Sequence, residues 1–223
     1  MVEPYGLIVL GNFPLPGSNG DTCGILVGNA GSAMWLKFRR SPEYSDGYPD
    51  PLDRWSRRIG ETIARELEAS VVFPFEGPPY PPFLAWAKST GRAFSSPLSM
   101  FIHWQFGLWH AYRFALRLDK PVSGQLEHDE AISPCLSCVE RPCLDTCPAG
   151  AFFEGEYRVN DCVEFLAANE TSGCRERGCR ARRACPVVPE NHYLPEHARF
   201  HMDAFIGTEF PGNKKSMIGK NFA

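Results

Sequence analysis

The chain has 223 residues, of which 43% are hydrophobic and 22% charged, and its formal net charge is -3 at pH 7. These values exclude an extended disordered chain, and the lack of a basic excess argues against nucleic acid as a partner. The length suits one large domain, or a main domain with a small appendage, and it allows a real hydrophobic core.

The cysteine content and the N-terminal residues bear on the compartment. The first ten residues lack the charged start, apolar run and cleavage site of an export signal, and no run of about 18 apolar residues occurs. We therefore expect a cytoplasmic protein with no membrane partner. In the reducing cytosol, nine cysteines argue against a disulfide framework and favour metal or cluster binding.

The first 70 residues predict two strands and a helix. Residues 5–10 and 22–27 are short apolar runs rich in branched side chains, and each predicts a buried strand. Asp50 and Pro51 predict a helix start, with Asp50 as the N-cap. The apolar face of this helix should pack against the sheet, and it consists of Leu52, Trp55, Ile59, Ile63 and Leu67.

The middle of the chain continues the same mixed pattern. Residues 71–75 predict a strand, 83–88 a short helix, and 95–118 two extended segments around a turn. The polar segment 119–133 predicts the domain boundary. The fold class is therefore α+β, with one domain over residues 1–125 and a second over residues 126–223.

Eight of the nine cysteines fall between Pro134 and Pro186. They are Cys135, Cys138, Cys143, Cys147, Cys162, Cys174, Cys179 and Cys185, and proline follows both Cys147 and Cys185. A compact run of cysteines can supply three ligands of a 4Fe-4S cluster, while a remote Cys-Pro supplies the fourth. Since ligands cross over in two-cluster ferredoxins, we assign Cys135, Cys138, Cys143 and Cys185 to one cluster, and Cys147, Cys162, Cys174 and Cys179 to the other.

Zinc is the main alternative for these cysteines, because it also takes four thiolates. The spacing departs from the usual ferredoxin motif in both groups, most in the second. Two Cys-Pro endings nevertheless favour iron, and disulfides come third in the cytosol. The remaining thiol, Cys23, lies in a predicted strand and is expected to be buried and inert.

Charged and titratable residues near the cysteines have more than one interpretation. Arginines crowd between Cys174 and Cys185, at positions Arg175, Arg177, Arg180, Arg182 and Arg183. They can stabilise an anionic cluster, or form a docking patch for an acidic electron donor or RNA phosphate. Three histidines follow, and we expect surface or packing roles for His192, His197 and His201.

The cysteine stretch also carries Pro148-Ala149-Gly150-Ala151 after Cys147, and a Tyr157-x4-Cys162 segment. From residue 133 to about 190 the chain resembles the ferredoxin-like module of epoxyqueuosine reductases and corrinoid-dependent reductive dehalogenases. The resemblance implies two 4Fe-4S clusters that relay electrons to a cobalamin in the N-terminal domain.

A second resemblance involves the twelve residues from Ile102 to Arg113, I-H-W-Q-F-G-L-W-H-A-Y-R. They are similar to a stretch of the cblC-type cobalamin-processing chaperone, which has a flavin-reductase-like fold. By position, the resemblance implies that seven residues line a corrin or flavin face: Ile102, His103, Phe106, Gly107, Trp109, Ala111 and Arg113. Without it, His103 and Arg113 are a satisfied buried histidine and an internal ion pair.

These observations predict an iron-sulfur protein that passes electrons from two 4Fe-4S clusters to a corrinoid, or to FMN, in a flavin-reductase-like domain. If it is an enzyme, it is a corrinoid- or flavin-dependent oxidoreductase supplied by an electron-donor protein. The alternatives are a non-enzymatic ferredoxin-type carrier and a zinc-stapled binding module.

Overall fold

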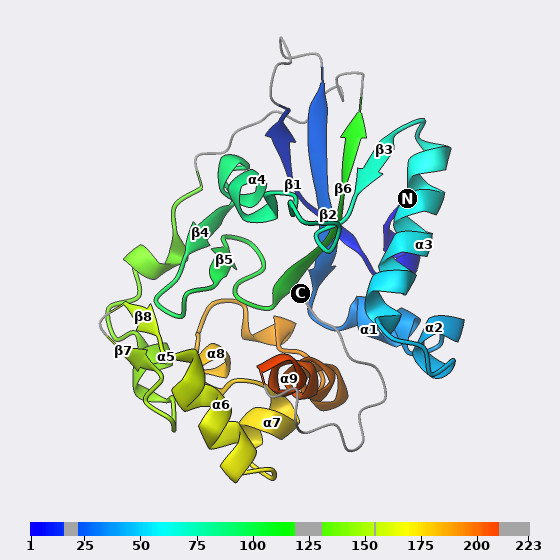
Figure 1. Cartoon of the computed structure of the whole chain (residues 1–223). Coiled ribbons are helices and arrows are strands. Elements are labelled where there is room, and N and C mark those ends of the chain that lie inside the picture. Colours follow the sequence, from blue (N-terminus) through cyan, green and yellow to red (C-terminus); the bar gives the residue numbers. More distant parts are fainter. Residues whose placement is uncertain (16–21, 119–130, 154, 210–223) are drawn as a thin grey trace.

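A four-stranded antiparallel sheet organises the first half of the protein. The computed structural model describes residues 1–15, 22–118, 131–153 and 155–209. The strands lie in the order β1-β2-β6-β3 (Figure 1), and their bounds are β1 Ile8–Pro14, β2 Cys23–Ala30, β6 His110–Leu118 and β3 Ser70–Val72. Strand β2 is almost entirely buried because it has a strand on each side and helices over the sheet. The protein is thus of mixed α and β structure.

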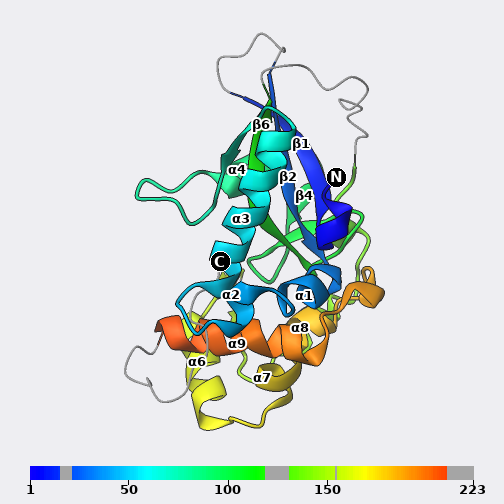
Figure 2. The same cartoon turned by 90° about the vertical axis from the view of Figure 1, so that its right-hand side faces the viewer.

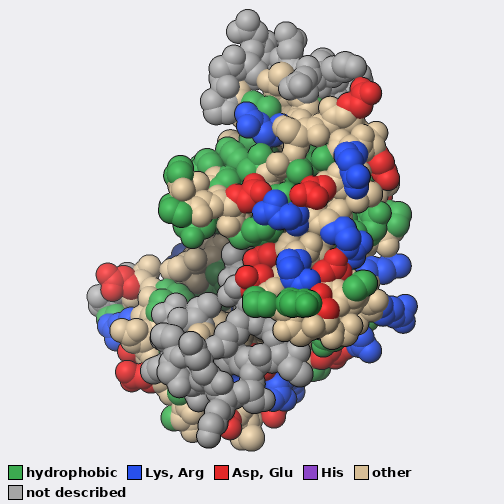
Figure 3. Space-filling view, turned by 45° about the vertical axis from the view of Figure 1, so that its right-hand side comes forward, with side chains coloured by type: hydrophobic (Ala, Val, Ile, Leu, Met, Phe, Trp, Pro, Cys, Tyr) green, Lys and Arg blue, Asp and Glu red, His purple; other side chains and the backbone are tan. Residues whose placement is uncertain are grey.

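One face of the sheet packs against α3 (Pro51–Glu66), with α1 (Ala33–Phe38) and α2 (Pro42–Ser45) at its lower end (Figures 1 and 2). The predicted helix start at Pro51 and the predicted apolar face are confirmed, since the residues from Leu52 to Ile63 on that face are buried. Asp50 does not cap the helix with its side chain, because its backbone is left-handed, with φ of 56°. The outer face of α3 carries interspersed basic and acidic side chains (Figure 3), and Arg57 pairs with Glu76 at 2.8 Å.

The other face packs against α4 (Phe83–Ser89) and a hairpin of β4 (Ala93–Ser95) and β5 (Phe101–His103). Phe13 of β1 stacks on Trp86 of α4, with ring centroids 4.8 Å apart. The predicted short helix is therefore confirmed, and the predicted strands correspond to β1, β2 and β3 with shifted ends. A core thus lies on each side of the sheet.

Short helices and turns form the lower half of the molecule around the cysteines (Figure 1). Their bounds are α5 Pro142–Asp145, β7 Phe152–Phe153, β8 Glu156–Tyr157, α6 Val159–Ala168, α7 Gly173–Arg177, α8 Arg180–Arg183 and α9 Pro195–Glu209. The sequence did not predict these helices. None of the helices in the described part of the chain is long and apolar enough to cross a membrane.

The last helix, α9, connects the two halves. Its Phe200 packs on Trp35 and Phe38 of α1, with ring centroids 5.0 and 5.6 Å apart. Its His197 stacks on Trp35 at 5.0 Å, with only 10° between the ring planes. The predicted boundary at residues 125 and 126 lies outside the described residues. Helix α9 therefore follows the cysteine stretch in sequence but completes the core of the sheet half.

Candidate metal centre

The first cysteine set consists of Cys135, Cys138, Cys143 and Cys185. All four line one cleft, together with prolines at positions 134, 142 and 186. Burial raises the pKa of Cys143, and the three other thiols of the set raise it further because each disfavours a second negative charge nearby. The remote Cys185 therefore lies beside the compact group, in the combination that the crossed ligand assignment predicts.

The second cysteine set consists of Cys147, Cys162, Cys174 and Cys179. Burial raises the pKa of Cys162, and Cys147 and Cys174 raise it further, whereas a hydrogen bond from Tyr157 lowers it. Burial also raises the pKa of Cys179 to about 11, and Cys174 and Cys162 add to this shift. The thiol nearest in sequence to the first set, Cys147, thus belongs electrostatically with the second.

Main-chain amides point at these sulfurs. The Ala151 N–H donates to Cys147 Sγ at 3.4 Å, and the Arg182 and Ala181 amides hydrogen-bond to Cys179. Such amide-to-sulfur bonds stabilise negative charge on a thiolate and tune the potential of a bound cluster. The turn after Cys147 and the start of α8 therefore have the polarity that thiolate ligands need.

A single metal ion and a four-iron cluster need different spacings of their thiolate ligands. In the described ranges, no three or more His, Cys, Asp or Glu side chains gather closely enough to hold a single metal ion. Thiolates around a four-iron cluster stand further apart than thiolates around one ion, because the iron-sulfide cube lies between them. The pKa shifts indicate that thiols of each set lie near one another, and the described residues offer no single-ion site.

The cleft of the first set is narrow. Its free volume is about 20 Å³, which is room for roughly one water molecule. The loop that carries Cys135 and Cys138 lies at the surface, with Leu136 80% and Val139 93% exposed. One side of the cleft is therefore an exposed loop, while Leu98, Ile102 and Leu108 on the other side belong to the core.

Three of the five arginines in this stretch hold the helices in place. Arg175 donates to Asp203 of α9 at 2.9 Å, and Arg183 donates to the Gly178 carbonyl at 3.3 Å. Arg182 donates through Nε and Nη2 to the Leu108 carbonyl at 3.1 and 2.6 Å, and it covers the ring of Trp109 at 4.1 Å. These side chains tie the second cysteine set to α9 and to the sheet half.

The seven residues of the corrinoid resemblance are mostly interior. Ile102, His103, Trp109 and Arg113 are at most 3% exposed. His103 Nδ1 accepts from the Gln105 amide at 3.2 Å, so its Nε2–H donates to the Leu10 carbonyl at 3.0 Å, and burial lowers its pKa to about 4. His103 is thus a satisfied, neutral core histidine.

The rest of the seven lie in different surroundings. Phe106 packs on His103 with ring centroids 4.7 Å apart, and Ala111 pairs with Asn29 across β6 and β2. Gly107 has φ of 65°, and a Cβ there would lie 2.6 Å from the Val187 carbonyl oxygen. Ile102 lines the cleft of the first cysteine set, and Trp109 lines a separate cavity. The structure therefore does not gather all seven around one pocket.

Arg113 is the least satisfied of the seven. Its Nε donates to Asn29 Oδ1 at 3.2 Å, while the buried Nη2 has no partner in the part of the chain that the structure describes. Burial lowers its pKa, and the charges of Tyr193 and Asp53 act in the opposite direction. Burial also raises the pKa of Asp53 to about 6, which Arg113 partly offsets. Arg113 and Asp53 therefore attract each other as the predicted internal pair, but no direct hydrogen bond joins their side chains.

A buried chain of polar side chains, which the sequence analysis missed, runs from Arg113 to α9. Asn29 Nδ2 donates to the Tyr193 hydroxyl at 2.9 Å, and the Tyr193 ring stacks on His197 at 3.8 Å. His197 Nδ1 lies 3.0 Å from Ser32 Oγ, and its Nε2 lies 3.2 Å from His201 Nε2. The spacing of Tyr193, His197 and His201 by four residues is the signal that could have indicated one helix face.

His197 and His201 are both neutral in this environment. Burial lowers the pKa of His197 to about 2, with Arg113 and Arg182 adding to the effect. Burial, followed by His197, also lowers the pKa of His201 well below its usual value. The predicted packing role of His197 is confirmed, since it is fully buried. His201 instead lines a cavity.

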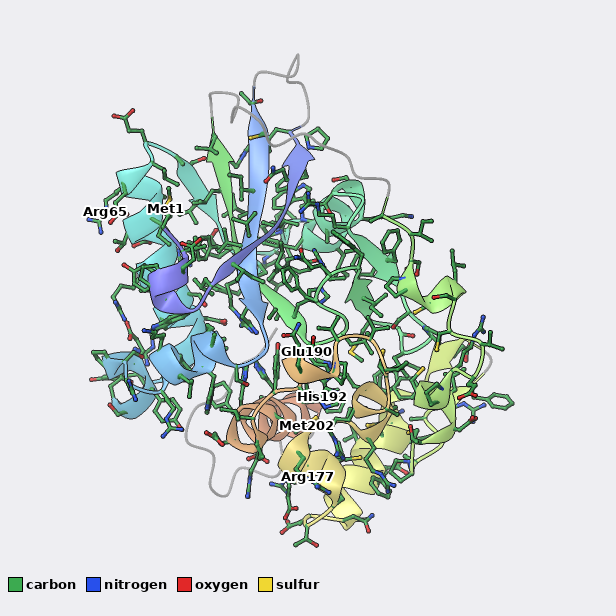
Figure 4. All side chains as sticks on the ribbon, turned by 180° about the vertical axis from the view of Figure 1, so that it is seen from behind. Met1, Arg65, Arg177, Glu190, His192 and Met202 are labelled. Atoms are coloured by element: carbon green, nitrogen blue, oxygen red, sulfur yellow. The ribbon has the colours of Figure 1, made fainter. Side chains whose placement is uncertain are left out.

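This cavity, of about 270 Å³, lies between the sheet half and the second cysteine set. Figure 4 shows Met202, one of its wall residues, below the sheet. Its walls include thioethers, the thiols of Cys162 and Cys179, and the aromatic rings of Trp109, Phe152, Tyr157, Tyr193 and Phe205. A small ligand in the cavity would therefore contact both halves of the protein.

No protein-family model matches the sequence, and no curated protein is significantly similar to it.

Proposed function

We propose that the protein is an iron-sulfur electron-transfer protein that holds two 4Fe-4S clusters. One observation carries the proposal: the eight cysteines form two sets of four that do not follow chain order. Cys185, the last of the eight, lies with the first three, and Cys147 lies with the later ones. Such an exchange is the ligand pattern of a two-cluster ferredoxin. A zinc ribbon instead pairs neighbouring cysteines.

The roles of the chain follow from this proposal. The first cysteine set would hold one cluster and the second set the other, and each cluster, when bound, supplies one-electron transfer. The amides of Ala151, Ala181 and Arg182 stabilise negative charge on the sulfurs. The prolines around the first set and the apolar side chains of Leu98 and Val187 line the cleft beside its thiols.

A corrinoid or a flavin in the sheet half is the acceptor that the resemblance implies. Most residues of that resemblance are buried, and His103 hydrogen-bonds to the Leu10 carbonyl of its own chain. Pockets for drug-sized ligands measure roughly 300–1,000 Å³, and a corrin macrocycle exceeds the 270 Å³ of the cavity beside Trp109. These observations favour the electron carrier over a corrinoid-dependent reductase.

Metal analysis of anaerobically isolated protein tests the proposal. We expect about eight irons and about eight acid-labile sulfides per chain, with broad absorption that bleaches on reduction. Zinc in place of iron and sulfide would refute it. Titration with cob(II)alamin and with FMN then tests for an acceptor in the sheet half. A spectral shift with one compound would identify it as the acceptor, whereas the carrier hypothesis requires no shift with either.

The exposed loop of the first cysteine set is the surface where we expect an electron-donor protein to dock. Ile132, Leu136 and Val139 are 73%, 80% and 93% exposed beside it, and exposed apolar patches mark interaction sites. Changing Leu136 and Val139 to glutamate should slow reduction by a reduced ferredoxin about tenfold or more. Reduction by dithionite, which needs no docking surface, should be unchanged. Equal slowing with both reductants would exclude docking at this loop.

A further inference from the structure

The cavity beside the second cysteine set extends beyond its thiols: Cys162 and Cys179 form one part of the wall, and aromatic and thioether side chains form most of the rest. It is lined from both halves of the chain. A carrier needs only its clusters and a docking surface. A cavity of about 270 Å³ with aromatic walls is instead what a ligand of one or two rings requires.

The walls indicate a flat, uncharged molecule. Trp109 and Tyr193 meet edge to face with centroids 5.0 Å apart, and Phe152 and Tyr157 stack at 4.8 Å. Aromatic rings and the thioethers of Met100 and Met202 favour contact with a planar π system. The thiols of the second set carry negative charge when they hold a cluster, which disfavours an anionic ligand next to them.

The polar groups of the wall indicate a ligand with hydrogen-bond acceptors. Arg182 lines the cavity, and in the described part of the chain it has no carboxylate partner. Two of its nitrogens donate to the Leu108 carbonyl, which leaves the N–H groups of Nη1. Ser99 also lines the cavity, and its φ is 55°, a conformation that is costly for serine and is often retained at binding sites.

We propose that this cavity binds a neutral, planar quinone-type molecule of one or two rings, with its carbonyl oxygens toward Arg182 and Ser99. The ring lies among Trp109, Tyr193 and Met202, next to the second cysteine set. That the ligand exchanges electrons with the protein rests on the proposed function, whereas its binding does not.

The test is calorimetric titration of the anaerobic full-length protein with 2,3-dimethyl-1,4-naphthoquinone, whose quinone ring has no open carbon for thiol addition. We expect saturable one-to-one binding. 1-Decalone, a non-planar two-ring ketone, should bind at least tenfold more weakly. The charged 1-naphthoate should also bind more weakly than the quinone, and tighter binding of naphthoate would overturn the assignment of a neutral ligand.

Two variants locate the site. Met202→Trp fills the cavity and should weaken quinone binding at least tenfold, whereas Leu36→Trp, which adds an indole on exposed α1, should leave it unchanged. Ser99→Gly removes the hydroxyl and relaxes the backbone, so it should fold normally and bind the quinone roughly three- to tenfold more weakly. Wild-type affinity in both Met202→Trp and Ser99→Gly would overturn the site.

Iron content separates this inference from the proposed function. If the protein contains iron but shows no saturable quinone binding, the proposed ligand is refuted and the proposed clusters stand. Quinone binding that is sensitive to Met202→Trp in a protein without iron would support the ligand and overturn the clusters.

Discussion

Replacing Cys147 by alanine should remove the second cluster and leave the first, so that the iron content falls from about eight to about four per chain. Cys147 lies only four residues after Cys143 in the sequence. Its thiol nevertheless raises the pKa of Cys162, and it is not among the thiols that raise the pKa of Cys143. The residual cluster should still give the electron paramagnetic resonance signal of a reduced 4Fe-4S centre.

Paired variants make the assignment decisive. Cys147→Ala combined with Cys162→Ala removes two ligands of one cluster, so about four irons should remain. Cys147→Ala combined with Cys143→Ala removes one ligand from each cluster, and little iron should remain. The opposite result would mean that ligands follow chain order. Cys23→Ala is the control that should keep the full iron content, because Cys23 lies in β2 on the sheet.

Replacing Gly107 by alanine should destabilise the protein by about 2 to 5 kcal/mol, by adding a steric clash to backbone strain. Gly107 has φ of 65°, and its Cβ would lie 2.6 Å from the carbonyl oxygen of Val187, two residues beyond Cys185. The contact joins the turn before β6 to the first cysteine set. Thermal unfolding of the anaerobic protein, followed by tryptophan fluorescence, measures the change.

Gly91 provides the matched control for backbone strain. It has φ of 68°, but a Cβ there would meet nothing within 4 Å. Gly91→Ala should therefore cost only the conformational strain, about 1 to 2 kcal/mol. If the two variants lose the same stability, the approach of Gly107 to Val187 contributes nothing, and the two halves are held together elsewhere.

The sheet half could largely be predicted because its signals are local. Proline at position 51 and apolar residues every three or four positions specify α3, and branched residues specify β1 and β2. The left-handed backbone of Asp50, which has no side-chain cap bond, could not be predicted from the sequence pattern. Local periodicity describes which face is apolar, but it does not describe how a chain enters an element.

The sequence of the helices around the cysteines shows no apolar periodicity from which they could be predicted. Helices α5 and α8 have four residues each, which is too few for a periodic pattern. Helix α9 contacts apolar clusters on several sides, through Phe200, Ala198 and Ile206. Its apolar residues therefore do not fall on one stripe, and the histidines within it had no predicted partner.

The candidate site was predictable in one respect. The exchange of Cys147 and Cys185 between the sets follows from the chemistry of a cluster that needs one remote ligand, and the structure groups the thiols in that way. The cavity could not be predicted, since its walls come from segments as distant as Leu98, Phe152 and Phe205. Only the folded chain brings them together.

The position of α9 also has a consequence for the order in which the protein is made. The strands of the sheet leave the ribosome first. His197 and Phe200 can pack against Trp35 only after α9 has emerged. Domains generally fold as units during synthesis, the N-terminal one first. In this chain the sheet core is complete only once α9 has packed on Trp35, so we expect closure of that core and maturation of the cysteine stretch both to come late.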